Sequence, residues 1–214
     1  MCAQFLIKAH LKDLADLFGI QIEQALSWSE RILPHQSAPV LSPAGLSLMN
    51  FSLIPSWSDS PRPKFATHNA RLETISEKAT WKKPFMTRHC VVPLSSFIEP
   101  IYSGALAGHM VCFNSQQLLL AAGIYDEWVN KSTGEIVTSF AIITTEPSPF
   151  VAQIGHDRQP LFIKPQRYTD WLHSTEQKKA SAADFLKLLA DLQETPQLST
   201  SVDRALKKGW EKRA

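Results

Sequence analysis

The second position of the chain holds a residue that could react with an aldehyde. The sequence opens "MCAQF", and removal of Met1 would leave Cys2 with a free α-amine and, on the adjacent carbon, a thiol. Both groups are nucleophiles, and the α-amine has a reference pKa of about 8, so a useful fraction of it is neutral at physiological pH. Cys2 is therefore a candidate reactive residue if other residues of the chain can assist it.

Two further stretches hold polar residues that packing alone does not require. In "THNARLET", Asn69 and Arg71 precede an expected helix, and Asn69 could serve simply as its cap. In "VVPLSSFIEP", Glu99 stands between Ile98 and Pro100. A carboxyl group in such apolar surroundings is either exposed at a strand end or partly buried with a raised pKa. Both stretches therefore allow a structural and a chemical interpretation.

The stretch "IGHDRQPLFI" places a titratable imidazole next to a guanidinium. His156, Asp157 and Arg158 lie between apolar runs, and Pro160 follows them. A single histidine is more often structural than catalytic, and Asp157 could merely pair with Arg158. Taken alone, this turn is only a candidate proton-transfer site.

Composition limits the classes of protein to consider. With 214 residues, 44% hydrophobic and 20% charged, the chain has the composition of one globular domain. The net charge of +2 predicts only weak overall attraction to nucleic acid, so anion binding needs local clusters of cations. Cys90 and Cys112 lie in apolar runs, which predicts burial rather than a disulfide or a zinc site. We expect no membrane span and no signal segment, and hence a cytoplasmic protein.

The elements that must position these residues are short and interrupted by 14 prolines. Periodicity and capping signals predict helices over residues 8–19, 71–79, 164–173 and 181–192. Apolar runs predict strands over residues 48–54, 90–93, 109–113, 118–122, 140–145 and 161–163. The expected class is α+β, with a strongly bent mixed or antiparallel sheet and peripheral helices. We expect one domain over residues 1–195 and a basic, loosely ordered tail over 196–214.

The stretches "MC", "SLIPSW", "NARLET", "VVPLSSFIEP", "SFAIITTEP" and "IGHDRQPLFI" occur in the order and approximate spacing of the SRAP family (SOS-response-associated peptidase). The chain resembles this family from Cys2 to about Trp171. The resemblance implies a single compact α+β domain with a barrel-like β-core, and single-stranded DNA containing abasic sites as the partner. It implies Cys2, Asn69, Glu99 and His156 as active-site residues. It further implies DNA contacts by Arg71, Arg158, Trp57, Lys64, Lys82, Lys83 and Arg88. We expect a monomer that needs no cofactor or metal and associates with the nucleoid when bound to DNA.

The resemblance also implies a reaction that the functional groups can perform. The α-amine of Cys2 would attack the open-chain aldehyde of an abasic site, and the thiol would close a five-membered thiazolidine on the resulting imine. Glu99 would transfer protons, His156 would help to open the sugar ring, and Asn69 would orient the sugar or the nascent amine. Elimination from the same imine would give a lyase side activity.

The sequence departs from the family pattern next to the reactive residue. Ala3 and Gln4 replace the usual glycine and arginine, and Pro100 replaces a tryptophan after Glu99. These departures affect the expected DNA affinity more than the expected chemistry. Two alternatives remain: a thiol peptidase or self-processing hydrolase that uses Cys2, and a non-catalytic module that binds single-stranded DNA.

Overall fold

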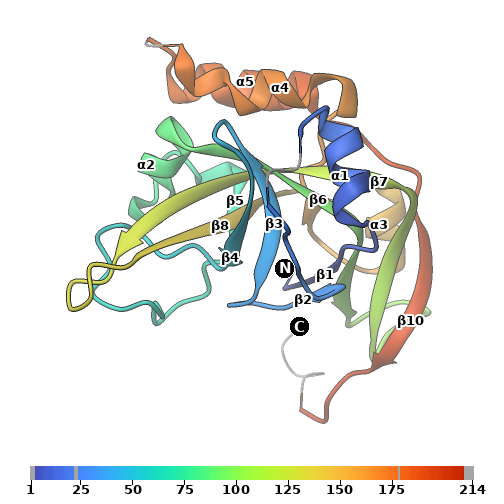
Figure 1. The fold of residues 1–214 in the computed structure, drawn as a ribbon. Helices are drawn as coiled ribbons and strands as arrows, with labels where there is room; N and C mark the ends of the chain where they lie inside the picture. Colours follow the sequence, from blue (N-terminus) through green and yellow to red (C-terminus); the bar gives the residue numbers. More distant parts are fainter. Residues whose placement is uncertain (1–2, 22–23, 178, 210–214) are drawn as a thin grey trace.

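Five strands form a closed ring at the centre of the computed structural model, which describes residues 3–21, 24–177 and 179–209. In order around the ring they are β7 (His109–Val129), β8 (Ile136–Thr145), β4 (Gly45–Phe51), β3 (Ser37–Ser42) and β6 (His89–Ile101). The ring closes because β6 also pairs with β7, and only the β4–β8 pair of the ring is parallel. The expected α+β domain with a strongly bent, barrel-like mixed β-core is confirmed (Figure 1).

Five further strands in the described part of the chain extend this ring: β1 (Gln4–Leu6), β2 (Arg31–Ile32), β5 (Asn69–Arg71), β9 (Gln159–Pro160) and β10 (Ser199–Ala205). β1 pairs with β6 and carries β2 on its other edge, whereas β10 pairs with the first part of β7. β5 and β9 both pair with the end of β8. Two candidate stretches that are distant in sequence therefore meet on one strand.

The two longest strands exceed the sequence-based prediction. The runs expected at 109–113 and 118–122 form one strand of 21 residues, β7, and the run expected at 90–93 belongs to the 13-residue β6. A register shift between Leu94 and Ser96 lets β6 bend without ending. The expected strand at 161–163 makes only isolated bridges, to Ala121 and Gln193.

Helices lie around the barrel, and Figure 1 shows α4 (Tyr168–Leu172) and α5 (Ala182–Leu192) side by side across one end. α1 (Leu11–Phe18) ends at Gly19 in the left-handed conformation, and Ser181 caps α5, so both of these predictions are confirmed. The helix expected at 71–79 is only a 3₁₀ turn over Leu72–Thr74. The remaining helices are α2 (Ala79–Thr87), α3 (Pro149–Ile154) and the 3₁₀ turns Pro165–Arg167 and Ser174–Glu176.

The hydrophobic core fills the barrel and also its outer face beneath the helices. Six phenylalanines pack inside the barrel: Phe5, Phe51, Phe97, Phe113, Phe140 and Phe162. Outside it, Trp171 of α4 stacks on His89 with 3.5 Å between ring centroids, and Phe185 of α5 meets the same imidazole edge-on. Cys90 and Cys112 are buried, as expected, and burial raises the pKa of both thiols. Neither described cysteine is therefore a competing surface nucleophile.

The sheet extends beyond the expected domain boundary at residue 195. The seven residues of β10 pair along β7, and the carboxylate of Asp203 accepts hydrogen bonds from the Arg31 guanidinium. These contacts tie β10 to β2 across the sheet, so much of the expected tail is integral to the fold. Residues 210–214 lie outside the described residues. No helix in the described part of the chain is long and apolar enough to cross a membrane.

Candidate active site

A buried carboxyl–imidazole pair lies near the end of β6. Glu99 has no exposed surface and shares the barrel-facing side of β6 with Phe97 and Ile101, since alternate strand residues face the same side. Oε2 of Glu99 lies 3.4 Å from Nε2 of His156, which is 6% exposed. Burial raises the pKa of Glu99, and the charge that His156 can carry opposes this rise. The pair therefore places a carboxyl group and an imidazole close enough to pass a proton between them.

The second ring nitrogen of His156 determines how the first can act. Nδ1 lies 2.7 Å from the carbonyl oxygen of Arg158, and the backbone N–H of Arg158 is directed at the same nitrogen from 3.2 Å. The two contacts make opposite demands on Nδ1, and the shorter one, to the carbonyl, is a hydrogen bond when Nδ1 carries the proton. In the neutral ring, Nε2 then turns its lone pair toward Glu99. The carboxyl of Asp157 is 86% exposed and 3.9 Å from Nδ1, so it is a minor partner.

The local sequence explains why His156 points inward. α3 ends at Gly155, which has φ of 105° and so adopts a conformation that favours glycine. A Cβ atom there would lie 2.5 Å from the carbonyl oxygen of Ser103. Because glycine has no Cβ, the chain can pass close to Ser103 and turn immediately after α3. This turn places His156 just before β9.

Asn69 lies beside the C-terminal half of β8, the strand with which β9 also pairs. It is 6% exposed and opens β5, where it pairs with Ile142, a residue of the barrel interior. Two residues further along both strands, Arg71 pairs with Thr144, which pairs with Pro160 of β9 on its other edge. The "NAR" and "HDRQP" stretches thus flank one strand end, and this arrangement is consistent with one site.

The two arginines of these stretches differ in solvent exposure and in ion pairing. Arg71 is exposed, whereas Arg158 is 8% exposed and its guanidinium binds both carboxylate oxygens of Glu73, at 2.8 and 3.0 Å. Arg158 also donates to the carbonyl oxygen of Thr144 at 2.7 Å. The predicted phosphate contact of Arg158 would have to compete with Glu73 and stays a prediction.

The predicted aromatic contact, Trp57, projects from an anchored turn. Its side chain is 56% exposed, although large aromatics are usually covered. The backbone nitrogen of Ser56 donates to the buried carboxylate of Asp126 at 2.8 Å, and the indole of Trp128 donates to the carbonyl oxygen of Ser58 at 2.7 Å. β7 therefore holds the turn on both sides of Trp57.

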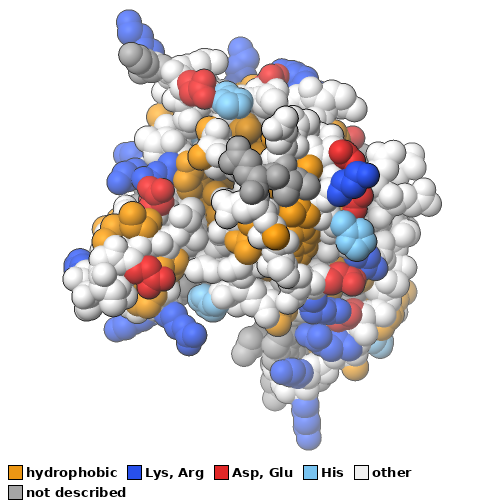
Figure 2. All heavy atoms as spheres, viewed as in Figure 1, with side chains coloured by type: hydrophobic (Ala, Val, Ile, Leu, Met, Phe, Trp, Pro, Cys, Tyr) orange, Lys and Arg blue, Asp and Glu red, His pale blue; other side chains and the backbone are white. Residues whose placement is uncertain are grey.

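The other residues predicted to contact DNA, all cations, differ in exposure and in ion pairing. Lys64, Lys82 and Lys83 are exposed, and Nζ of Lys83 lies 3.5 Å from the Ser56 hydroxyl. Arg88 is instead occupied by ion pairs with Asp126 and Glu127. Figure 2 shows basic and acidic side chains interspersed over the visible face rather than gathered in one basic band. DNA contacts by these residues stay predictions.

Two residues near the predicted site were missed by the sequence analysis. Phe65, which is 50% exposed, lies in the same loop as Trp57, and its neighbour Lys64 gave the only sequence signal. His68 is half-buried beside Asn69, and its ring packs edge-on against Phe51 with centroids 5.8 Å apart. Burial lowers the pKa of His68 to about 4, so its imidazole is neutral at physiological pH. A histidine preceding "NAR" was the available signal.

Cys2 lies outside the described residues, but the strand that follows it is well defined. Gln4 pairs with Ile98 and Phe5 with Phe97 in antiparallel register. Continuing this register by one residue leads from Gln4 back toward Glu99. The side-chain oxygen of Gln4 accepts a hydrogen bond from Arg31, so a guanidinium of β2 lies beside the glutamine.

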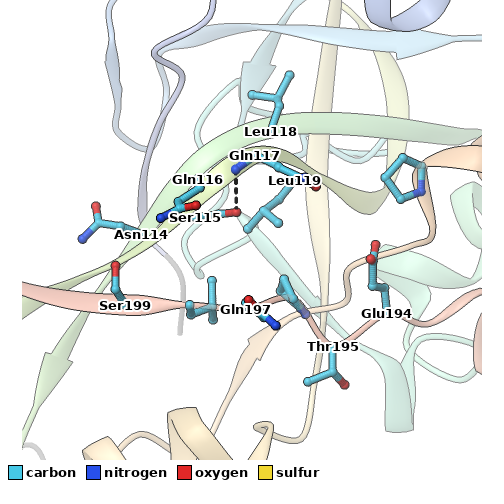
Figure 3. A pocket seen from close by; sticks show the side chains of 13 residues that line it. Asn114, Ser115, Gln116, Gln117, Leu118, Leu119, Glu194, Thr195, Gln197 and Ser199 are labelled. Atoms are coloured by element: carbon cyan, nitrogen blue, oxygen red, sulfur yellow. Dashed lines mark hydrogen bonds between the residues drawn. The ribbon is translucent and has the colours of Figure 1, made fainter.

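Neither a metal-binding cluster among the described residues nor the cavity on β7 adds to this site. They contain no group of three or more histidine, cysteine or acidic side chains that could hold a metal ion. A cavity of about 430 Å³ lies between residues 114–119 of β7 and the segment 194–199 (Figure 3). Amide and hydroxyl side chains dominate its lining, and it shares no residue with the Glu99–His156 pair.

The fold and site define a class of protein: a β-barrel domain with a buried carboxyl–imidazole pair beside its N-terminal strand. The family model described as "SOS response associated peptidase (SRAP)" matches residues 1–206, and the chain belongs to this family. Of the predicted site residues, the structure brings Glu99 and His156 into contact and places Asn69 on β5, which pairs with β8 as β9 does.

Named relatives and solved structures agree with this membership. The chain is 29% identical over 217 residues to "Abasic site processing protein YoaM" of Bacillus subtilis, covering 95% of this chain and 93% of that protein. It is 30% identical over 167 residues to "Abasic site processing protein HMCES" of Xenopus tropicalis, covering 67% and 49%. A crystal structure from Bacteroides thetaiotaomicron matches with a TM-score of 0.76 at 24% identity, covering 95% and 92%. The structural match supports the fold alone.

Proposed function

We propose that this protein processes abasic sites in DNA and that it captures the abasic aldehyde covalently with Cys2. The observation that carries the proposal is the buried Glu99–His156 pair, 3.4 Å apart, whose carboxyl group lies on β6, the strand that β1 joins. Only Ala3 separates Cys2 from Gln4 in the sequence, and Gln4 pairs with Ile98, the residue before Glu99. The names of the relatives YoaM and HMCES support DNA with abasic sites as the substrate.

The proposed reaction forms two bonds to the aldehyde carbon and releases one water. The neutral α-amine of Cys2 adds to the carbonyl and gives a carbinolamine. Loss of hydroxide with a proton, as water, leaves an imine. The thiol then adds its sulfur to the imine carbon and its proton to the nitrogen, which closes the thiazolidine. Ring closure is intramolecular and is therefore favoured by a high effective molarity.

Glu99 and His156 suit the proton transfers of this sequence. Burial raises the pKa of Glu99, so its carboxyl can be protonated when the carbinolamine must lose water, and can then accept a proton again. The pair relays that proton because the Nε2 lone pair of His156 faces the carboxyl. His156 also assists opening of the closed sugar, and Asn69 orients the sugar. Proton loss from the sugar at the imine stage provides the lyase side path.

The proposed DNA surface combines exposed aromatic and basic side chains. Trp57 and Phe65 offer faces for stacking of unpaired bases, and Lys64, Arg71 and Lys82 offer charges for phosphates. Stacking of this kind requires unpaired bases, which favours single-stranded DNA as the partner. With a net charge of only +2, non-covalent binding should weaken clearly as salt increases.

Intact-protein mass spectrometry tests the proposal. The protein is mixed with a single-stranded oligonucleotide carrying one abasic site, beside the same oligonucleotide without it. We expect an adduct only with the abasic strand, at the summed mass minus one water. Cys2→Ser retains the amine without the thiol, so it should give an adduct only when a hydride reductant traps the imine. An uncleaved N-terminal extension should abolish both adducts.

The same experiment separates the two alternatives. A thiol peptidase would depend on the sulfur of Cys2 and tolerate a blocked amine, whereas aldehyde capture requires both groups. A non-catalytic binding module would retain both oligonucleotides equally and form no adduct. Formation of an adduct by the extended protein, or equal retention without an adduct, would refute the proposed capture.

A further inference from the structure

Glu73 connects the two halves of the candidate site, although neither the sequence analysis nor the proposed chemistry used it. It lies in the 3₁₀ turn directly after β5, and its carboxylate forms a two-point ion pair with Arg158 at 2.8 and 3.0 Å. The Arg158 side chain is 10% exposed and that of Glu73 is 45% exposed. The ion pair therefore fastens the "NARLET" stretch to the "HDRQP" stretch across the end of β8.

Arg158 is held in place by more than this ion pair. One guanidinium nitrogen also donates to the carbonyl oxygen of Thr144 at 2.7 Å and lies 3.2 Å from its hydroxyl. A planar guanidinium bound at two edges has one position, because its donors point in fixed directions. Glu73 and Thr144 together thus hold the guanidinium end of the residue, and its main chain leads directly into β9, which pairs with β8.

The main chain of Arg158 is what His156 contacts. The Arg158 carbonyl oxygen lies 2.7 Å from Nδ1 of His156, closer than the Arg158 N–H at 3.2 Å, and so favours the tautomer with a proton on that nitrogen. The other nitrogen, Nε2, then presents its lone pair to Glu99 at 3.4 Å. A displaced carbonyl would allow the proton to move to Nε2, which would reverse the direction of the hydrogen bond to Glu99.

We propose that Glu73 is a positioning residue: by clamping Arg158, it keeps the carbonyl of that residue against Nδ1 of His156 and so fixes the tautomer that faces Glu99. The consequence for catalysis rests on the proposed function. The tautomer itself does not, because it is a property of the protein without DNA. A purely stabilising ion pair would alter stability on mutation but leave the tautomer unchanged.

The test compares Glu73→Gln, which keeps the shape but removes the charge, with the wild-type protein. Glu77→Gln is the matched control, because Glu77 is exposed on the next turn and outside this ion pair. Glu73→Asp keeps the charge on a shorter side chain that cannot span both contacts. Two-bond proton–nitrogen correlation spectra of nitrogen-15-labelled protein report the His156 tautomer. Crosslinking rates at saturating abasic DNA and binding of intact single strands are measured in parallel.

We expect wild type and Glu77→Gln to show the Nδ1–H tautomer, and Glu73→Gln to show a mixture of both tautomers. Crosslinking by Glu73→Gln should be about tenfold slower, and Glu73→Asp should be intermediate. Binding should not weaken, because loss of the carboxylate frees the Arg158 charge. An unchanged tautomer in Glu73→Gln would overturn the proposal, and so would an altered tautomer with an unchanged rate. If wild type forms no crosslink, the proposed function fails, and the spectra alone decide whether Glu73 sets the tautomer.

Discussion

Nε2 of His156 lies 3.4 Å from Oε2 of Glu99, and both side chains are more than nine-tenths buried. The carboxyl comes from β6, which closes the barrel, and the imidazole from the turn that precedes β9. Such a pair can carry one proton on either partner, and burial favours the states without separated charge. This relationship determines the pH dependence expected of both activity and stability.

Replacing the carboxyl should remove most of the proposed proton transfer. Glu99→Gln keeps the size of the side chain but cannot donate and accept a proton in turn. We expect crosslinking at saturating abasic DNA to slow by about a hundredfold or more, with a flatter pH profile. Single-turnover rates between about pH 5 and pH 9 measure this. Glu135→Gln, on the exposed end of the β7–β8 connection, is the control, and equal rates for the two variants would argue against Glu99 as the proton donor.

The same substitution should stabilise the protein at neutral and alkaline pH. The pKa of Glu99 is raised in the folded state above its ordinary value of 4.5. The folded protein therefore binds this proton more tightly than the unfolded chain, and its stability declines as pH rises from about 4.5 through the raised value. The melting temperature of Glu99→Gln should exceed that of wild type by a margin that grows with pH. A constant margin from pH 4 to 8 would mean that the carboxyl titrates normally.

The anchored turn around Trp57 allows a backbone test of DNA binding. Ser56 is the first central residue of the turn that Ser58 N and Pro55 O close at 2.8 Å, a position that accepts proline. Ser56→Pro removes the N–H that donates to Asp126, whereas Ser56→Ala keeps it. Fluorescence anisotropy with intact single-stranded DNA should show weaker binding by Ser56→Pro and unchanged binding by Ser56→Ala. Trp57→Ala should weaken binding about tenfold and sets the scale. Equal affinities of all three variants would exclude Trp57 from the DNA surface.

His89 should make the fold sensitive to acid. Burial lowers its pKa to about 4, although Nε2 donates a hydrogen bond to the carbonyl of Phe85 and Nδ1 lies 2.7 Å from the hydroxyl of Ser174. The unfolded chain binds the proton near pH 6.5, so stability is complete above that pH and falls as pH drops toward 4. At pH 5 the loss from this residue is about 2 kcal/mol.

Urea unfolding at pH 7.5 and pH 5 measures this effect. His89→Gln should be less stable than wild type at pH 7.5, and the difference should shrink at pH 5. A His89→Gln deficit that is independent of pH would contradict the neutral buried imidazole.

Local sequence was enough to predict the features that depend on neighbouring residues. The ends of α1 and α5 follow from Gly19 and from the Ser181–Asp184 cap, because helix ends are satisfied by hydrogen bonds within a few residues. The burial of Cys90 and Cys112 follows from the apolar runs around them. The candidate residues Asn69, Glu99 and His156 were chosen from their types and surroundings, and the resemblance joined them into one hypothesis.

What those side chains contact depends on the assembled fold. Closure of the barrel by β6 and β7, and the pairing of β5 and β9 with one strand, depend on hydrogen bonds between segments far apart in sequence, which no local pattern specifies. The presence of an arginine in the sequence also did not show whether it is free to bind DNA. Arg158 and Arg88 form ion pairs with carboxylates on distant elements, whereas Arg71 is exposed. The burial that raises the pKa of Glu99 likewise arises from the closed barrel, since desolvation is a property of the whole packed fold rather than of the neighbours Ile98 and Pro100.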